Sequence, residues 1–297
     1  MSGGRERLVG TAGVVVGLAL AAGVLRASET RYPAETSPKR LLYLRSGESA
    51  RRAVLSFDAL AADIYWIRAI QHYGRDKKSD RVAGRFELLQ PLLDLTTTLD
   101  PHFNIAYRFG AVFLSFSPPN GPGRTDQAIE LLMKGLRHNP QRWQFAYDIG
   151  FVHYFSTKDY AEAARWFGRA AEMPGAPEWI RSLAARTSIE GGDVDGAEAL
   201  FAELAMSPEP AIRQVGVRGR LQIRALRTIE ELTRYVNRFH EINGRYPDGW
   251  GDLIRARMVG GYPEDATGAR FVYDAPTHSV TLSPASTLAP LPQLSRR

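Results

Sequence analysis

An alanine that is followed four residues later by a large apolar residue recurs three times in the middle of this chain. The pairs are Ala128 and Leu132, Ala163 and Phe167, and Ala197 and Phe201, at intervals of 35 and 34 residues. A separation of four residues places both side chains on one face of a helix. An interval of this size is typical of helical hairpins that stack in a row, because one hairpin cannot bury its own apolar face alone. The chain is therefore predicted to be mainly α-helical.

The residues around these pairs resemble the tetratricopeptide repeat (TPR). The fullest copy has Gly150 in its first helix, then Ala163, Phe167 and Ala170, and closes at Pro174. Similar copies surround Ala128 and Ala197, and a more degenerate one runs from 57 to 101. The resemblance implies a right-handed solenoid of helix pairs, in which small residues let neighbouring helices approach closely. We expect this solenoid to occupy residues 57–226 and to end with a helix at 211–226.

The second repeat has an insertion between its two helices. Eighteen residues separate Gly110 from Ala128, against 13 between Gly150 and Ala163, which indicates about five extra residues. The extra residues fall in 115–126, where three prolines and two glycines exclude a continuous helix. We expect a protruding loop here, serving either as a binding finger or as a rigid spacer, with Thr125 or Asp126 capping the next helix.

The amino terminus has the composition of a membrane anchor. After a short tail at 1–7, residues 8–25 contain no charge and would span about 27 Å as a helix, which is enough to cross a bilayer. Residues 26–56 read as a linker. We expect a single-pass protein of the bacterial inner membrane with the bulk of the chain outside the cytoplasm, and Gly13 and Gly17 as a weak signal for self-association. Signal cleavage after Ala21 is the alternative.

The TPR resemblance implies that a protein or peptide partner binds in a concave groove lined by the first helix of each repeat. The positions that the family turns inward are rich in aromatic side chains, which recur as binding anchors. They are Trp66, Tyr73, Asn104, Tyr107, Gln144, Tyr147, Phe151 and Tyr154, with Arg186 at one end of the groove. Helical spacing equally permits that half of these rings lie in the interhelical core.

Residues 227–284 have a different pattern and are predicted to form a small α+β module. A capping box at 228–231 starts a helix that ends at Asn243 and Gly244, and two alternating runs at 268–274 and 279–283 read as a hairpin. This part resembles the soluble part of type II secretion pseudopilins, without their amino-terminal helix. A structural cap for the solenoid is the alternative. Residues 285–297 are expected to be a flexible tail.

The sequence contains no pattern that indicates catalysis. It has no cysteine, its six histidines lack metal-ligand spacing, and no glycine loop for phosphate is present. The arginines between 213 and 227 lack interleaved aromatic residues, so no nucleic acid is expected despite a net charge of +6. We expect no enzyme, cofactor or metal. The chain is predicted to be a membrane-anchored scaffold for envelope, secretion or pilus-type assembly, or else a soluble periplasmic module for a peptide or glycan.

Overall fold

A computed structural model describes residues 57–79 and 84–293, all within one compact unit, Gly47–Arg297. The predicted tail at 1–7, the anchor at 8–25 with Gly13 and Gly17, and the linker at 26–56 lie outside the described residues. Among the residues that are described, no helix is long and apolar enough to cross a membrane.

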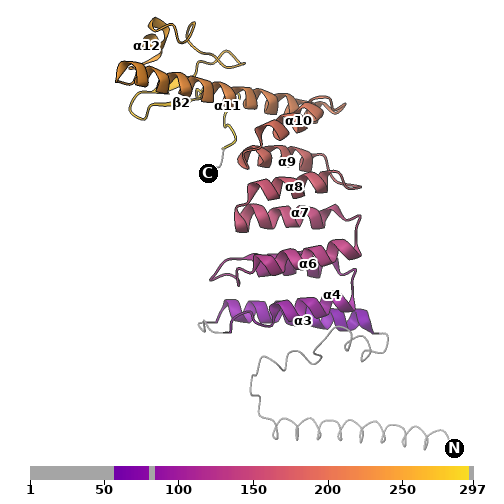
Figure 1. Cartoon of the computed structure of the whole chain (residues 1–297). Coiled ribbons are helices and arrows are strands. Elements are labelled where there is room, and N and C mark those ends of the chain that lie inside the picture. Colours follow the sequence, from indigo (N-terminus) through magenta and orange to yellow (C-terminus); the bar gives the residue numbers. More distant parts are fainter. Residues whose placement is uncertain (1–56, 80–83, 294–297) are drawn as a thin grey trace, which may run out of the picture. The chain divides into compact units, whose positions relative to one another are not determined.

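The described chain is mainly helical, with one small sheet, as the sequence predicts. Each helix from α4 to α11 packs against the helix before it, and Figure 1 shows them following one another in chain order. The helices of this stack are α3 (Asp58–Lys77), α4 (Leu89–Leu99), α5 (Asn104–Ser115), α6 (Thr125–His138), α7 (Trp143–Val152), the π-helical turn η2 (His153–Thr157), α8 (Tyr160–Ala171), α9 (Trp179–Glu190), α10 (Val194–Ala205) and α11 (Pro210–Asn243).

The repeated alanine and bulky residues form the core of this stack. All six side chains of the three pairs are at most 2% exposed. Two of the helices that carry them have capped starts: the side chain of Asp159 accepts from the Glu162 amide before α8, and that of Asp193 accepts from the Gly196 amide before α10. These caps satisfy backbone donors that a helix start otherwise leaves unpaired.

Glycines set how closely neighbouring helices approach. A Cβ added at Gly150 in α7 would lie 2.7 Å from the ring of Phe167 in α8, which is too short for real carbon atoms, and one at Gly219 in α11 would overlap the ring of Phe201 in α10. Each ring therefore occupies the space that a side chain at the glycine would fill. These two contacts therefore set how closely α8 approaches α7 and how closely α10 approaches α11.

The sequence register of α5 differs by one residue from the prediction. The buried residues Ala106, Tyr107, Gly110 and Ala111 of α5 match Phe145, Ala146, Ile149 and Gly150 of α7, an offset of 39 rather than 40. Gly150 is thus equivalent to Ala111, not to Gly110, and the insertion contains four residues instead of five. One residue corresponds to a rotation of about 100°, so the side chains that α5 exposes are not the predicted ones.

The insertion contacts α3 and α5, and its residues 116–120 are exposed. The Tyr73 hydroxyl donates to the Asn120 carbonyl over 2.7 Å, and the buried Gly121 lies against Phe116. The helix that follows begins at Thr125 with Arg124 at the cap position and no side-chain cap. The two roles considered for this loop, a binding finger and a rigid spacer, both stay predictions.

The last helix of the stack continues into the carboxy-terminal module without a break. α11 has 34 residues, so the predicted capping box at 228–231 and the boundary between 226 and 227 both fall inside it; the capping-box prediction is wrong. Its end is as predicted, with Gly244 in the left-handed conformation at φ 68°. The module adds α12 (Trp250–Arg255), β1 (Val272–Asp274) and β2 (Ser279–Thr281), and the two strands pair antiparallel with Tyr273 opposite Val280.

The predicted flexible tail packs on α11 instead. Gln222 donates from Nε2 to the carbonyls of Leu288, over 2.8 Å, and Pro290, over 3.0 Å. The Leu288 side chain is 2% exposed and belongs to the module's core with Phe239 and Trp250. The prediction of flexibility is therefore wrong for 285–293, because it overlooked one buried leucine and the acceptors around it. Residues 294–297 lie beyond the described part.

We expect Gly150→Ala to lower the free energy of unfolding by about 1–3 kcal/mol, because the added methyl group overpacks the contact with Phe167. Gly168→Ala is the matched control. Gly168 lies inside α8 with no atom within 4 Å of the added Cβ, so the higher helix propensity of alanine should raise stability by up to about 1 kcal/mol. Urea denaturation of both variants measures the difference, and equal effects at the two positions would contradict the packing argument.

Candidate protein-binding face

The end of α7 carries a cluster of aromatic side chains. α7 passes into η2, which stops at Lys158 in the left-handed conformation. Wider π-type turns inside helices occur frequently at functional sites. The rings that meet around this segment, here called the aromatic row, are Trp143, Tyr147, Phe151, Tyr154, Phe155 and Trp179.

Ring contacts run through the row without interruption. The Tyr147 ring lies 6.1 Å from Trp143, 6.4 Å from Phe151 and 5.6 Å from Trp179 on α9, measured between centroids. Phe151 in turn lies 4.3 Å from Phe155, which lies 4.9 Å from Tyr154. Edge-on and tilted pairs of this kind stabilise one another beyond simple burial. The row is therefore a pre-ordered surface joining α7, η2 and α9.

Three of these rings face solvent while the others anchor them. Phe151 is 38% exposed, Trp179 47% and Phe155 53%. Trp143, Tyr147 and Tyr154 are half-buried, and Tyr147 rests on the buried Phe167 ring of the core, 5.5 Å away. Exposed rings on a rigid base present contact area without much loss of conformational entropy when a partner binds.

The row is uncharged at neutral pH. Burial, and secondly the carboxylate of Asp148, raises the pKa of Tyr147, while burial and a hydrogen bond with Glu190 raise the pKa of Tyr154 to about 12. Burial lowers the pKa of the neighbouring His153 below its usual value, so its ring is neutral at pH 7. Such a surface suits apolar or neutral polar groups.

An ion pair joins the row to α5. Arg108 of α5 donates to both carboxylate oxygens of Asp148 in α7, over 3.0 Å from Nη2. Burial raises the pKa of Asp148, although the hydrogen bond and charge of Arg108 act in the opposite direction. The same hydrogen bond raises the pKa of Arg108. Two-point contact of this type fixes orientation as well as distance. The pair therefore holds α5 and α7 in register on this side of the stack.

α5 extends the face with apolar side chains on either side of that arginine. Ile105 lies three residues before Arg108, and Phe109 follows it directly. Each of the two side chains is 55% exposed. With the corrected register they match Gln144 and Asp148 of α7. The exposed surfaces of α5 and α7 thus belong to equivalent faces of two successive helix pairs.

Five predicted groove residues fall in this neighbourhood. Phe151 is exposed, Tyr147 and Tyr154 are half-buried in the row, and Arg186 is exposed on α9, where its charge counteracts the rise in the Tyr154 pKa. Gln144 is half-buried on α7, one turn before Asp148. The structure thus brings together the predicted residues of α7 and α9.

The predicted residues of α3 and α5 lie elsewhere. Tyr107 is fully buried and Tyr73 is 8% exposed, and burial raises the pKa of Tyr107 to about 12; the prediction that they line an accessible groove is wrong. Trp66 is half-buried against Phe103 and Phe113. Asn104 is half-buried, with an Oδ1 atom that has no hydrogen-bond partner among the described residues.

Five residues of this face were not predicted from the sequence: Trp143, Phe155, Trp179, Ile105 and Phe109. Phe155 lies on the π-helical turn, which shifts side chains away from α-helical spacing. Ile105 and Phe109 were missed because of the one-residue error in α5. A comparison of the whole buried pattern of α5 with that of α7, rather than of one glycine, would have found them.

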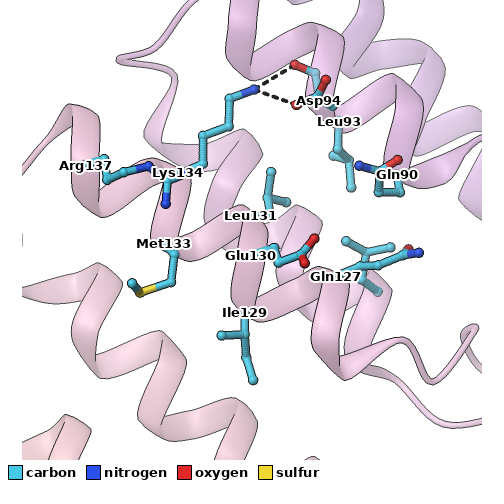
Figure 2. A pocket seen from close by; sticks show the side chains of 11 residues that line it. Gln90, Leu93, Asp94, Gln127, Ile129, Glu130, Leu131, Met133, Lys134 and Arg137 are labelled. Carbon is cyan, nitrogen blue, oxygen red and sulfur yellow. Dashed lines mark hydrogen bonds and ion pairs between the residues drawn. The ribbon is translucent and has the colours of Figure 1, made fainter.

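A hollow lies between α4 and α6, away from the aromatic row. Its volume is about 520 Å³, and Leu93, Leu114 and Leu131 are among its apolar lining. Figure 2 shows Lys134 reaching from α6 to Asp94 on α4, where its Nζ lies 2.7 Å from the carboxylate and 3.1 Å from the main-chain carbonyl. With Thr97 and Thr98 as further acceptors, Lys134 is engaged within the fold. None of the predicted site residues lines this hollow.

Within the part of the chain that the structure describes, no group of three or more acidic or histidine side chains is placed to hold a metal ion. Comparisons of the chain with protein-family models, with curated proteins and with solved structures found no match.

We expect Arg108→Ala to destabilise the protein by about 1–2 kcal/mol at pH 7, since it leaves the largely buried Asp148 carboxylate without its counter-charge. A buried aspartate whose pKa is raised favours folding below its unfolded pKa and loses that contribution as the pH rises through the folded value. The deficit of the variant should therefore shrink toward about pH 3, where Asp148 is protonated in both proteins.

Adding Asp148→Asn to Arg108→Ala is the control, because it removes the unpaired charge. Denaturation at pH 7 and at low pH checks both variants against the parent. The double variant should recover most of the stability at pH 7; a deficit that is the same at every pH would show that the ion pair has no part in it.

Proposed function

We propose that this protein is a TPR-like solenoid that acts as a membrane-anchored scaffold and binds an apolar segment of a protein partner on the aromatic row. The observation that carries the proposal is the exposure of Phe151, Phe155 and Trp179. The rings of Phe151 and Phe155 touch each other, and Trp179 joins them through the ring of Tyr147. Exposed aromatic rings that gather in one place mark binding surfaces more often than scattered ones do.

The charge pattern narrows the kind of partner. The only ion pair described at the centre of the face, Arg108 with Asp148, is satisfied internally, and the tyrosine hydroxyls are neutral. Affinity would come from burying apolar area, and Arg186 and Lys158 at the edge would orient the partner. We therefore favour a peptide segment with large apolar residues over a nucleic acid or a strongly acidic ligand.

The anchor at 8–25 and an extracytoplasmic location in a bacterial inner membrane belong to the same proposal, as does assembly of an envelope, secretion or pilus-type complex. They are supported by the 18 uncharged residues that precede the linker. Amino-terminal sequencing of the protein purified from membranes distinguishes this arrangement from a released periplasmic module: a chain that starts at Ala22 has no anchor.

We expect Phe151→Ala with Phe155→Ala to weaken partner binding at least about tenfold, because aromatic anchors typically contribute 1 kcal/mol or more each. The readout is crosslinking to the partner from a photoreactive residue at position 179 in intact cells. Since both rings are more than one-third exposed, the thermal midpoint should change little.

Tyr262→Ala provides the matched control, because this tyrosine is 56% exposed in the carboxy-terminal module. It removes an equally exposed ring from outside the aromatic row and should leave crosslinking intact. If the double variant retains its crosslinked partner, or if the control loses it to the same degree, the aromatic row is not the binding site.

A further inference from the structure

The first helix of the stack has a second apolar face that no described residue covers. Phe57 is 67% exposed, Leu60 57%, Ile64 42% and Ile67 51%. They follow one another at intervals of three or four residues, so they lie in one row along α3. The opposite side of the same helix carries Ala62 and Ala69, both fully buried. α3 is therefore apolar on two opposite faces, and only one of them is used by the fold.

The other end of the stack is closed. α11 packs on α10, where Phe201 and Leu204 are 2% and 3% exposed, and its glycines receive the Phe201 ring and the α10 backbone. Stacked repeats require such a cap, because an unpaired end exposes apolar surface. Each helix from α4 to α11 packs against the helix before it. In the described stack, α3 has no helix before it, so its outer face is left without a neighbour.

The row on α3 becomes basic toward its carboxyl end. The same helical spacing leads from Ile67 to Gln71, then to Arg75 and Lys78, which are exposed. The linker sequence at 26–56, which leads directly into α3, contains seven arginines and lysines against three acidic residues. An apolar row with cationic side chains at its border is the composition of helices that lie in the interface of an anionic membrane.

We propose that the outer face of α3 lies on the anionic surface of the lipid bilayer, with Leu60, Ile64 and Ile67 among the acyl chains and Arg75 and Lys78 at the phosphates. This rests on the anchoring in the proposed function. The 31 residues between the anchor and α3 span at most about 110 Å when extended, so α3 stays within that distance of the membrane. Contact along α3 would orient the stack relative to the bilayer.

The absence of cysteine from the sequence allows a direct test. Ile64→Cys and Ile67→Cys are made separately in the full chain, labelled with an environment-sensitive fluorophore and reconstituted into vesicles of phosphatidylethanolamine and phosphatidylglycerol. Glu203→Cys, at an exposed position on α10, is the control. Insertion into the acyl region should shift the emission of the labels at 64 and 67 to the blue, and spin-labelled lipid should quench them. The label at 203 should show neither effect.

Two further variants test the charges. Arg75→Gln with Lys78→Gln should reduce the quenching at 64 in vesicles that contain phosphatidylglycerol and should have no effect in purely zwitterionic vesicles. Equal quenching with and without these cations would overturn the assignment of the phosphate contacts.

Three results would overturn the proposal as a whole. A label at 64 that iodide in the water phase still quenches in vesicles shows an uncovered face. A label that is shielded from iodide before any vesicle is added shows that the chain covers α3 itself. Disulfide-linked dimers of Ile64→Cys without lipid quenching show a second copy there. Flotation of the same vesicles tests whether the anchor holds the protein on the membrane, and crosslinking from position 179 tests whether the aromatic row binds a partner. A negative result for α3 can therefore be distinguished from a negative result for the anchor or for partner binding.

Discussion

The stack depends on close contact between a small residue of one helix and a large side chain of its neighbour. At Gly150 and Gly219 the facing ring lies where a Cβ would be, and at Gly135 the ring of Phe145 does the same from α7, at 2.8 Å. Because interiors are packed to nearly crystalline density, such a contact fixes both the distance and the register of two helices. The orientation of α7, and with it the direction in which the aromatic row points, follows from the contacts at Gly135 and Gly150.

This constraint explains why much of the fold could be predicted from the sequence. Contacts of this kind require a small and a large residue at a fixed separation, which can be recognised in the sequence. The three pairs from Ala128 to Phe201 therefore identified core positions correctly. The method failed where a glycine had another use. Gly110 makes room for Leu93 and Leu131, and reading it as the equivalent of Gly150 displaced the register of α5 by one residue. The prediction that a separate helix starts at 228 was wrong because a threonine followed by glutamates is equally compatible with a helix interior.

The candidate site was less predictable, because the exposure of a side chain depends on which other helices pack against it. With α5 displaced by one residue, the prediction treated Tyr107 as the equivalent of Tyr147. In the structure Tyr107 corresponds to the buried Ala146, and it is enclosed between α4 and the Phe145 ring of α7, with its hydroxyl on the Thr97 carbonyl. Tyr147 meets Trp143 and Trp179 at an open edge. The predicted residues of α7 and α9 lie close together in the structure, whereas the burial of those on α3 and α5 depends on how three helices pack.

The continuous α11 changes what the carboxy-terminal module contributes. Ile223 belongs to the core beneath α10, while Ala225, two residues later, belongs to the core of the module with Val236 and Leu253. Because the two cores share one helix and alternate along it, the module cannot reorient without breaking α11. The helix and hairpin of the module bury the carboxyl end of α11 and the chain that returns along it through Leu288. The predicted likeness to pseudopilins and the alternative role as a cap both stay predictions, and either role would have to operate with the module held in one orientation on α11.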